Sequence, residues 1–158
     1  MAESPFLQLP RSAWVACNAL GFAIRDRYPV SPGHTLVVPH RQVATWFEAT
    51  REEQHALLDL VDEVKRQLDA ELSPAGYNVG FNAGRAAGQT VWHLHVHVIP
   101  RFDGDMDDPR GGVRHVIPGK GNYLATLDNG GVEVRREEEA PAGVHRARGS
   151  GRRAPQPP

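Results

Sequence analysis

A short run of alternating residues constrains the fold of this chain more than any other feature. From His93 to Val98 the order is His-Leu-His-Val-His-Val. Successive side chains of a β-strand point to opposite faces of the sheet, so this spacing predicts a strand with His93, His95 and His97 on one face. The aliphatic side chains would lie on the other face. One face of the strand would then carry chemistry, and the opposite face would help to form a core.

The remaining periodicity predicts an α+β fold. Further strands are expected at residues 14–18, 21–25, 34–39 and 77–82, and the histidine strand at 92–100. A long helix is predicted over 50–72, where Thr50 and Glu53 form a capping box. Its apolar face is expected at Leu57, Val61, Val64, Leu68 and Leu72. A shorter helical turn is expected around 43–48. Since short turns join most neighbouring strands, an antiparallel sheet with the long helix on one face fits best.

Length and composition favour one domain followed by a polar tail. The chain has 158 residues, and domains commonly hold about 100–200 residues. We expect residues 1–134 to form the domain with a C-terminal extension, and the Arg- and Pro-rich residues 135–158 to be disordered, with no assigned role. Residues 1–134 carry 12 Lys and Arg against 16 Asp and Glu, whereas residues 135–158 carry 6 against 3. The mildly acidic body would therefore bind a small anion only through a local cluster of donors.

The same sequence excludes several broad classes. Its one cysteine, Cys17, cannot form an internal disulfide, which indicates a reducing compartment. No apolar run approaches the about 18–20 residues of a membrane helix, and the first residues do not resemble a signal peptide. We therefore expect a cytoplasmic protein with neither membrane nor nucleic acid as a partner. The other histidines, His40, His55, His115 and His145, are expected at the surface.

The histidine row is compatible with two kinds of chemistry. Three neighbouring imidazoles could hold zinc with an open position for a catalytic water, although no obvious set of residues would orient the ligands. Alternatively, a neutral imidazole can attack phosphorus at pH 7 while its neighbours donate hydrogen bonds to phosphate oxygens. The approach to the row favours the second interpretation. Gly84 and Gly88 would let backbone come close to a ligand, and Asn82, Gln89 and Thr90 supply neutral donors.

These residues carry a family resemblance. Residues 88–101, Gly-Gln-Thr-Val-Trp-His-Leu-His-Val-His-Val-Ile-Pro-Arg, resemble the signature of the histidine triad (HIT) family of nucleotide hydrolases. Residues 22–39 resemble that family's nucleoside-binding hairpin, which holds a separate histidine. The resemblance implies a five-stranded antiparallel sheet with one long and one short helix. It also implies a homodimer with a continuous sheet.

The resemblance also assigns roles to four histidines. His95 would be the nucleophile that attacks the α-phosphorus of a nucleotide and becomes transiently nucleotidylated. His97 and His34 would contact the phosphate, and the backbone carbonyl of His93 would hold the ring of the nucleophile. This chemistry needs no metal or cofactor, although a divalent cation can accompany a polyphosphate substrate.

Further positions match the nucleotide contacts of the family. Asp26 would bind the ribose hydroxyls, and Ile24 and Leu36 would contact the base. Asn82, Gln89 and Thr90 would contact the phosphate or the leaving group. In the extension, Arg114 could reach a distal phosphate.

The resemblance leaves the substrate open. Histidine at the third triad position, His97, points away from the branch with glutamine there, which resembles transferases and phosphorylases, and towards hydrolases. Residues 88–91 before the triad, and Pro100 and Arg101 after it, resemble the fragile histidine triad branch, which hydrolyses dinucleoside polyphosphates. Asp26 and Asn82 resemble the Hint branch, which cleaves nucleoside phosphoramidates. A protein that binds nucleotide without useful turnover, as a regulator would, is the alternative from another class.

Overall fold

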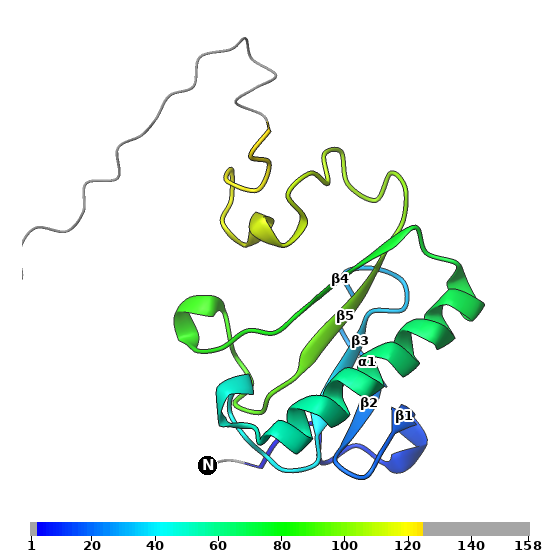
Figure 1. Ribbon diagram of the computed structural model, residues 1–158, viewed down its shortest axis with the longest axis vertical. Coiled ribbons are helices and arrows are strands. Elements are labelled where there is room, and N and C mark those ends of the chain that lie inside the picture. Colours follow the sequence, from blue (N-terminus) through cyan, green and yellow to red (C-terminus); the bar gives the residue numbers. More distant parts are fainter. Residues whose placement is uncertain (1–2, 125–158) are drawn as a thin grey trace, which may run out of the picture. The chain divides into compact units, whose positions relative to one another are not determined.

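The computed structural model describes residues 3–124, and its core is one antiparallel sheet (Figure 1). The strands are β1 (Trp14–Cys17), β2 (Gly21–Arg25), β3 (Thr35–Pro39), β4 (Gly76–Gly80) and β5 (Val96–Arg101). Their order in the sheet is β1-β2-β3-β5-β4, with every neighbouring pair antiparallel. The one long helix of the described residues, α1 (Arg51–Leu72), connects β3 to β4 in the chain. The predicted α+β class and the number of strands are confirmed.

Helix α1 begins where the capping box predicts. The hydroxyl of Thr50 accepts a hydrogen bond from Glu53 N–H at 3.2 Å, and the Glu53 carboxylate accepts one from Thr50 N–H at 2.8 Å. Each partner thus satisfies a backbone donor that has no acceptor within the helix. The helix ends at Ser73, whose backbone is left-handed with φ 48°. Pro74 follows and cannot continue the helix.

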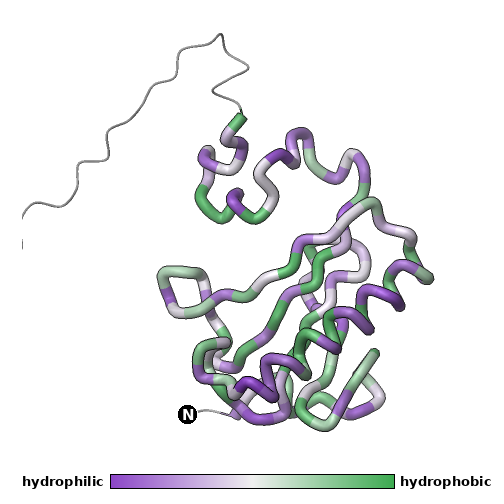
Figure 2. The backbone as a smooth tube through the Cα atoms, in the orientation of Figure 1, coloured by the Kyte–Doolittle hydropathy of each residue, from purple (hydrophilic) through white to green (hydrophobic). Residues whose placement is uncertain are grey.

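Helix α1 packs on one face of the sheet. Its fully buried apolar side chains are Leu57, Leu60, Val64 and Leu68, which contact Val37, Val96 and Val98 of the strands. The predicted stripe was partly wrong, because Leu60 replaces Val61 at the buried centre and Leu72 is 38% exposed. Figure 2 shows the resulting alternation of hydrophilic and hydrophobic residues along α1.

A second apolar cluster lies among side chains from the alternate positions of β2 and β3. It contains Phe22, Ile24, Leu36 and Val38, with Phe6 and Trp14 packed against them. Since neighbouring residues of β2 and β3 fall into different clusters, both faces of these central strands are covered. This second cluster adjoins the histidines.

The histidine strand starts later than predicted. Its ladder with β3 runs only from Thr35↔Val98 to Val37↔Val96, so β5 begins at Val96 and not at residue 92. Pro39 of β3 has no N–H to donate, and its carbonyl accepts from the ring of His93 instead. The turn predicted around 43–48 is a short 3₁₀ turn, Trp46–Glu48. These differences shift boundaries and leave the topology unchanged.

The chain beyond β5 forms a short extension. Arg101 donates two hydrogen bonds to the Asp105 carboxylate and one to Asn78 of β4, which holds the first turn after the strand. A 3₁₀ turn follows at Gly112–Val116. The predicted boundary at residue 134 and the predicted disordered tail, 135–158, lie outside the described residues. No helix within residues 3–124 has the length and apolar character needed to cross a membrane.

Candidate active site

The three triad histidines lie together on the face predicted for them. Leu94, Val96 and Val98 belong to the core cluster that includes α1. The rings of His95 and His97 contact each other on the other side, with 5.1 Å between their centroids. The alternation from His93 to Val98 is therefore retained, even though the regular ladder begins only at Val96.

The backbone sets the protonation pattern of His95. Its Nδ1 lies 2.8 Å from the carbonyl oxygen of His93. A carbonyl oxygen can only accept, so Nδ1 of His95 carries the hydrogen, and Nε2 of the neutral ring carries the lone pair. The ring is half-buried. His95 thus has a free nucleophilic nitrogen of defined identity.

His93 is enclosed completely and offers only its backbone to the site. Its side chain is 0% exposed. Nε2 lies 2.9 Å from the carbonyl oxygen of Pro39, and Nδ1 lies 2.7 Å from the hydroxyl of Ser4. Burial lowers the pKa of His93, which keeps the ring neutral. The geometry required for the implied role of its carbonyl is present.

His97 and His34 form a coupled neutral pair. Nε2 of His34 lies 2.9 Å from Nδ1 of His97. Burial, followed by the nearby His95 and His34, lowers the pKa of His97 to about 4, and burial also lowers the pKa of His34. Within residues 3–124, Nε2 of His97 is a buried nitrogen without a hydrogen-bond partner. A buried polar atom left unsatisfied costs about 1–3 kcal/mol, which a ligand group that hydrogen-bonds to this nitrogen would relieve.

Asp26 lies behind His34. Its Oδ2 is 3.4 Å from Nδ1 of His34, and its Oδ1 accepts a hydrogen bond from the backbone N–H of Tyr28 at 2.9 Å. The carboxylate thus stabilises the turn between β2 and β3 and faces the histidine pair. Its predicted contact with ribose would use the acceptor sites that these two interactions leave.

The other predicted nucleotide contacts fall into two groups. Ile24 and Leu36 are only 4% and 5% exposed and belong to the apolar cluster beside the histidines. In the loop before β5, Asn82 is half-buried and Thr90 is exposed. Gln89 is buried, and its amide is engaged with backbone: it accepts from Gly84 N–H at 2.8 Å and donates to the carbonyls of Ala44 and Val91. The side chain of Gln89 therefore stabilises the loop through hydrogen bonds to backbone, a role that the sequence did not predict.

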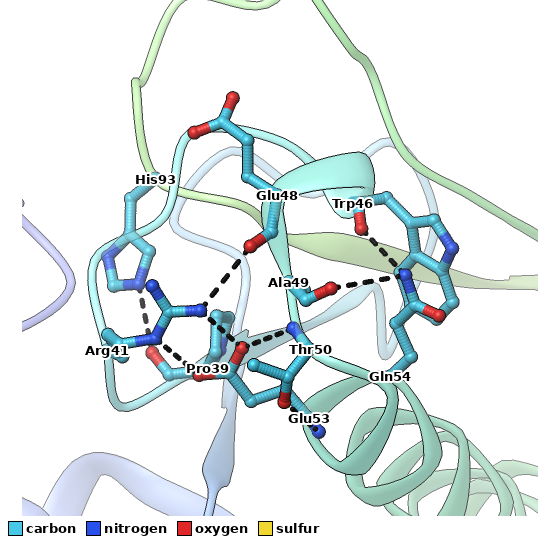
Figure 3. A network of polar contacts seen from close by, with 9 residues as sticks. All are labelled: Pro39, Arg41, Trp46, Glu48, Ala49, Thr50, Glu53, Gln54 and His93. Atoms are coloured by element: carbon cyan, nitrogen blue, oxygen red, sulfur yellow. Dashed lines mark hydrogen bonds and ion pairs between the residues drawn. The ribbon is translucent and has the colours of Figure 1, made fainter.

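A polar network fixes the segment between β3 and α1 (Figure 3). Arg41 donates two hydrogen bonds of 2.7 Å to the buried carboxylate of Glu53, in a fork that also lowers the pKa of Glu53. Glu53 is at the same time the capping-box residue of α1. Pro39, whose carbonyl accepts a hydrogen bond from the His93 ring, lies two residues before Arg41 in the chain. The network therefore links the first turn of α1 to the backbone segment that holds His93.

Two site residues were missed by sequence reasoning. Ser4 contacts the ring of His93, and Phe6 packs against both His93 and His95 at centroid distances of 5.9 Å and 5.2 Å. Ser4 and His93 are 89 residues apart in the chain. No periodicity or motif joins such distant positions, so only the fold reveals the contact.

One group in the described part of the chain has the residue types of a metal site. One side-chain atom from each of Asp26, His34 and His97 lies within 4.8 Å of the other two. Carboxylate and imidazole ligands suit zinc. The hydrogen bond between the two imidazoles already occupies one ring nitrogen of each, so a metal would have to bind the remaining ring nitrogens or displace the proton that the two rings share.

Comparison with known proteins agrees with the fold and the histidine row. The family model described as "HIT domain" matches residues 11–104. This chain therefore belongs to the HIT family. A Streptococcus mutans UA159 protein of known structure superposes with a TM-score of 0.62 at 32% identity, covering 70% of this chain and 73% of that one. A HIT family member from Bacillus subtilis gives a TM-score of 0.61 at 27% identity, covering 80% of this chain and 93% of that one.

Curated relatives have enzymatic names. A Mycobacterium tuberculosis protein named AP-4-A phosphorylase is 37% identical over 109 residues, covering 65% of this chain. The match spans 56% of that protein's length. The Schizosaccharomyces pombe protein named bis(5'-nucleosyl)-tetraphosphatase [asymmetrical] is 31% identical over 128 residues, covering 81% of this chain and 70% of that protein.

Proposed function

We propose that this chain is a nucleotide hydrolase that cleaves its substrate at the α-phosphate through a covalent nucleotidyl-histidine. The observation that carries the proposal is the hydrogen bond from His95 Nδ1 to the carbonyl of His93, since it leaves Nε2 of His95 as the free nucleophile. The adjacent ring of His97 carries the buried Nε2 that has no hydrogen-bond partner among residues 3–124.

Two displacements would complete the reaction. In the first, the lone pair of His95 Nε2 forms a bond to the α-phosphorus while the bond to the leaving group breaks. The positive charge that develops on the ring is stabilised by the carbonyl that accepts from Nδ1. In the second, water attacks the same phosphorus, the nitrogen–phosphorus bond breaks, and nucleoside monophosphate leaves as the water gives up a proton.

The preferred substrate class is a dinucleoside polyphosphate. The names of the two curated relatives support it, since both denote enzymes of dinucleoside tetraphosphates. The name phosphorylase adds phosphate as a second possible acceptor for the nucleotidyl group, which the prediction from His97 did not favour. A nucleoside phosphoramidate is the competing substrate.

Further features of the proposal concern assembly and location. Within residues 3–124, β4 pairs only with β5, which leaves the outer edge of β4 without a neighbouring strand. Protein sheets seldom leave such an edge unprotected, and pairing with a second copy would close it. We propose a cytoplasmic homodimer that requires no metal for the chemical step.

Product analysis tests the function. Purified protein is incubated with diadenosine tetraphosphate, with and without inorganic phosphate, and in parallel with adenosine 5′-phosphoramidate. A hydrolase releases AMP and ATP from the first substrate regardless of phosphate, whereas a phosphorylase releases ADP and ATP only when phosphate is present. Binding of AMP without any product would overturn the proposal in favour of a regulator.

A further inference from the structure

The N-terminal segment reaches the histidine site through buried polar contacts. Ser4 is only 2% exposed, and its hydroxyl lies 2.7 Å from Nδ1 of His93. Its backbone N–H donates to the side-chain oxygen of Gln42 at 3.2 Å. Two different interactions therefore hold Ser4 against the core of the site.

The direction of each hydrogen bond follows from the chemistry of the partners. The carbonyl of Pro39 can only accept, so Nε2 of His93 carries the hydrogen. Nδ1 of the neutral ring must then accept, and the Ser4 hydroxyl is the donor. The same hydroxyl oxygen accepts from the backbone N–H of Phe6 at 3.3 Å. Every polar atom of the His93 ring is satisfied in one tautomer only.

The chain of contacts continues to His95. The carbonyl of His93 accepts from Nδ1 of His95 at 2.8 Å. Phe6, two residues after Ser4, packs its ring on both histidines. A rotation of the His93 ring would therefore disturb the backbone of His93, which orients His95. The hydrogen bonds of the ring to Ser4 and to Pro39 oppose that rotation from its two sides.

We propose that Ser4 is a positioning residue for the nucleophile: its hydroxyl fixes the tautomer and orientation of the His93 ring, and the carbonyl of His93 in turn fixes the tautomer of His95. The inference rests on the proposed role of His95 as the nucleophile. It extends that role to a serine that touches neither the phosphate nor the reacting nitrogen.

Three variants test the proposal. Ser4→Ala removes the donor to His93, and Ser4→Thr keeps a hydroxyl at the same position. Ser12→Ala is the matched control, because Ser12 is an exposed serine in the same N-terminal part of the chain. The measurements are kcat, KM and histidine ¹⁵N chemical shifts, which distinguish protonated from unprotonated ring nitrogens in the free protein.

The proposal predicts a specific pattern. In the unaltered protein, His93 is protonated at Nε2 and His95 at Nδ1. In Ser4→Ala, the rings of His93 and His95 each become a mixture of the two tautomers. The value of kcat falls by about tenfold to a hundredfold, because small displacements of reacting atoms lower rates by factors of that order. KM changes much less. Ser4→Thr recovers most of kcat, and Ser12→Ala behaves like the unaltered protein.

Several results would overturn it. Protonation of His93 at Nδ1 in the unaltered protein would do so without any variant, even if Ser4→Ala failed to fold. If Ser4→Ala left both tautomers and kcat unchanged, or changed only the stability and KM, Ser4 would contribute to packing and would not position the nucleophile. The shift measurements need no substrate, so a protein that lacks turnover altogether would fail the proposed function while the positioning of His95 by Ser4 is still tested.

Discussion

Nε2 of His34 and Nδ1 of His97 lie 2.9 Å apart, so that the buried ring of His34 and the half-buried ring of His97 share a single hydrogen bond. Asp26 lies 3.4 Å from the other nitrogen of His34 and opposes the lowering of its pKa without cancelling it. The pair is therefore neutral near pH 7. Among the residues that the structure describes, Nε2 of His97 has no hydrogen-bond partner, so the uncharged pair presents this nitrogen to the site.

The neutrality of this pair predicts an acid-sensitive fold. The pKa of His97 falls from its ordinary value of 6.5 to about 4. Between pH 6.5 and pH 4 the unfolded chain binds more protons at His97 than the folded protein does. The folded protein is therefore most stable, with respect to this group, above about pH 6.5, and its stability decreases as the pH falls towards 4. The free energy of unfolding should decrease by up to about 1.4 kcal/mol per pH unit for this group. Urea unfolding between pH 7 and pH 4.5 measures the slope.

A variant separates His97 from the other buried histidines. His97→Asn removes one titrating group, whereas His34 and His93 still contribute, since burial lowers the pKa of each. The slope of stability against pH should become smaller in this variant. An identical slope would mean that His97 has the same pKa in the folded and the unfolded chain, which contradicts the account.

The capping box predicts a local stability effect. Thr50→Ala removes the acceptor for Glu53 N–H at the start of α1. Loss of such a cap costs about 1 kcal/mol of unfolding free energy. Thr45→Ala is a suitable control, because the hydroxyl of Thr45 contacts the exposed side chain of Glu48 and caps no backbone donor. Equal losses in the two variants would contradict the capping assignment.

The buried amide of Gln89 predicts an effect on substrate binding. Gln89→Glu replaces two N–H donors by a carboxylate oxygen facing the carbonyls of Ala44 and Val91. The unmet carbonyls and the buried charge should lower the unfolding free energy by about 1–3 kcal/mol and loosen the loop, so that KM rises. Gln8→Glu, at an exposed position, makes the same chemical change as a control. A KM equal to that of the unaltered protein would exclude the loop from the binding site.

Metal removal distinguishes a zinc hydrolase from a hydrolase whose nucleophile is a histidine, the two kinds of chemistry that the histidine row allows. A phosphoramidate carries no polyphosphate chain for a cation to accompany, so its cleavage should be unaffected by EDTA. Activity lost to EDTA and restored by zinc would instead show that the reaction depends on a metal, for which Asp26, His34 and His97 are the candidate ligands.

Local patterns predicted much of this protein because the interactions behind them are local. The capping box joins Thr50 to Glu53, three positions further along the chain, and the alternation from His93 to Val98 separates core from site without knowledge of other strands. The start of β5 depends instead on Pro39, a residue on the neighbouring strand whose carbonyl the ring of His93 occupies. The sequence of either segment alone does not show that the Pro39 carbonyl bonds to a side chain and not to a neighbouring strand.

The supports of the site were the least predictable part. Residue type shows that Gln89 can donate and accept, but only the fold shows that its amide hydrogen-bonds to backbone groups. Ser4 and Phe6 meet the histidine row through chain packing over a separation that no motif covers. Such contacts arise from tertiary structure, so sequence periodicity carries no signal for them.

The covalent intermediate is the most direct test of the account. Protein is mixed with diadenosine tetraphosphate, quenched rapidly under conditions that preserve phosphoramidates, digested and analysed by mass spectrometry. We predict an adenylyl group on the peptide that contains His95, attached to its ring, and neither an adduct nor turnover in a folded His95→Ala protein that still binds AMP. An adduct on another residue, or turnover that persists in His95→Ala, would contradict the assignment of His95 as the nucleophile.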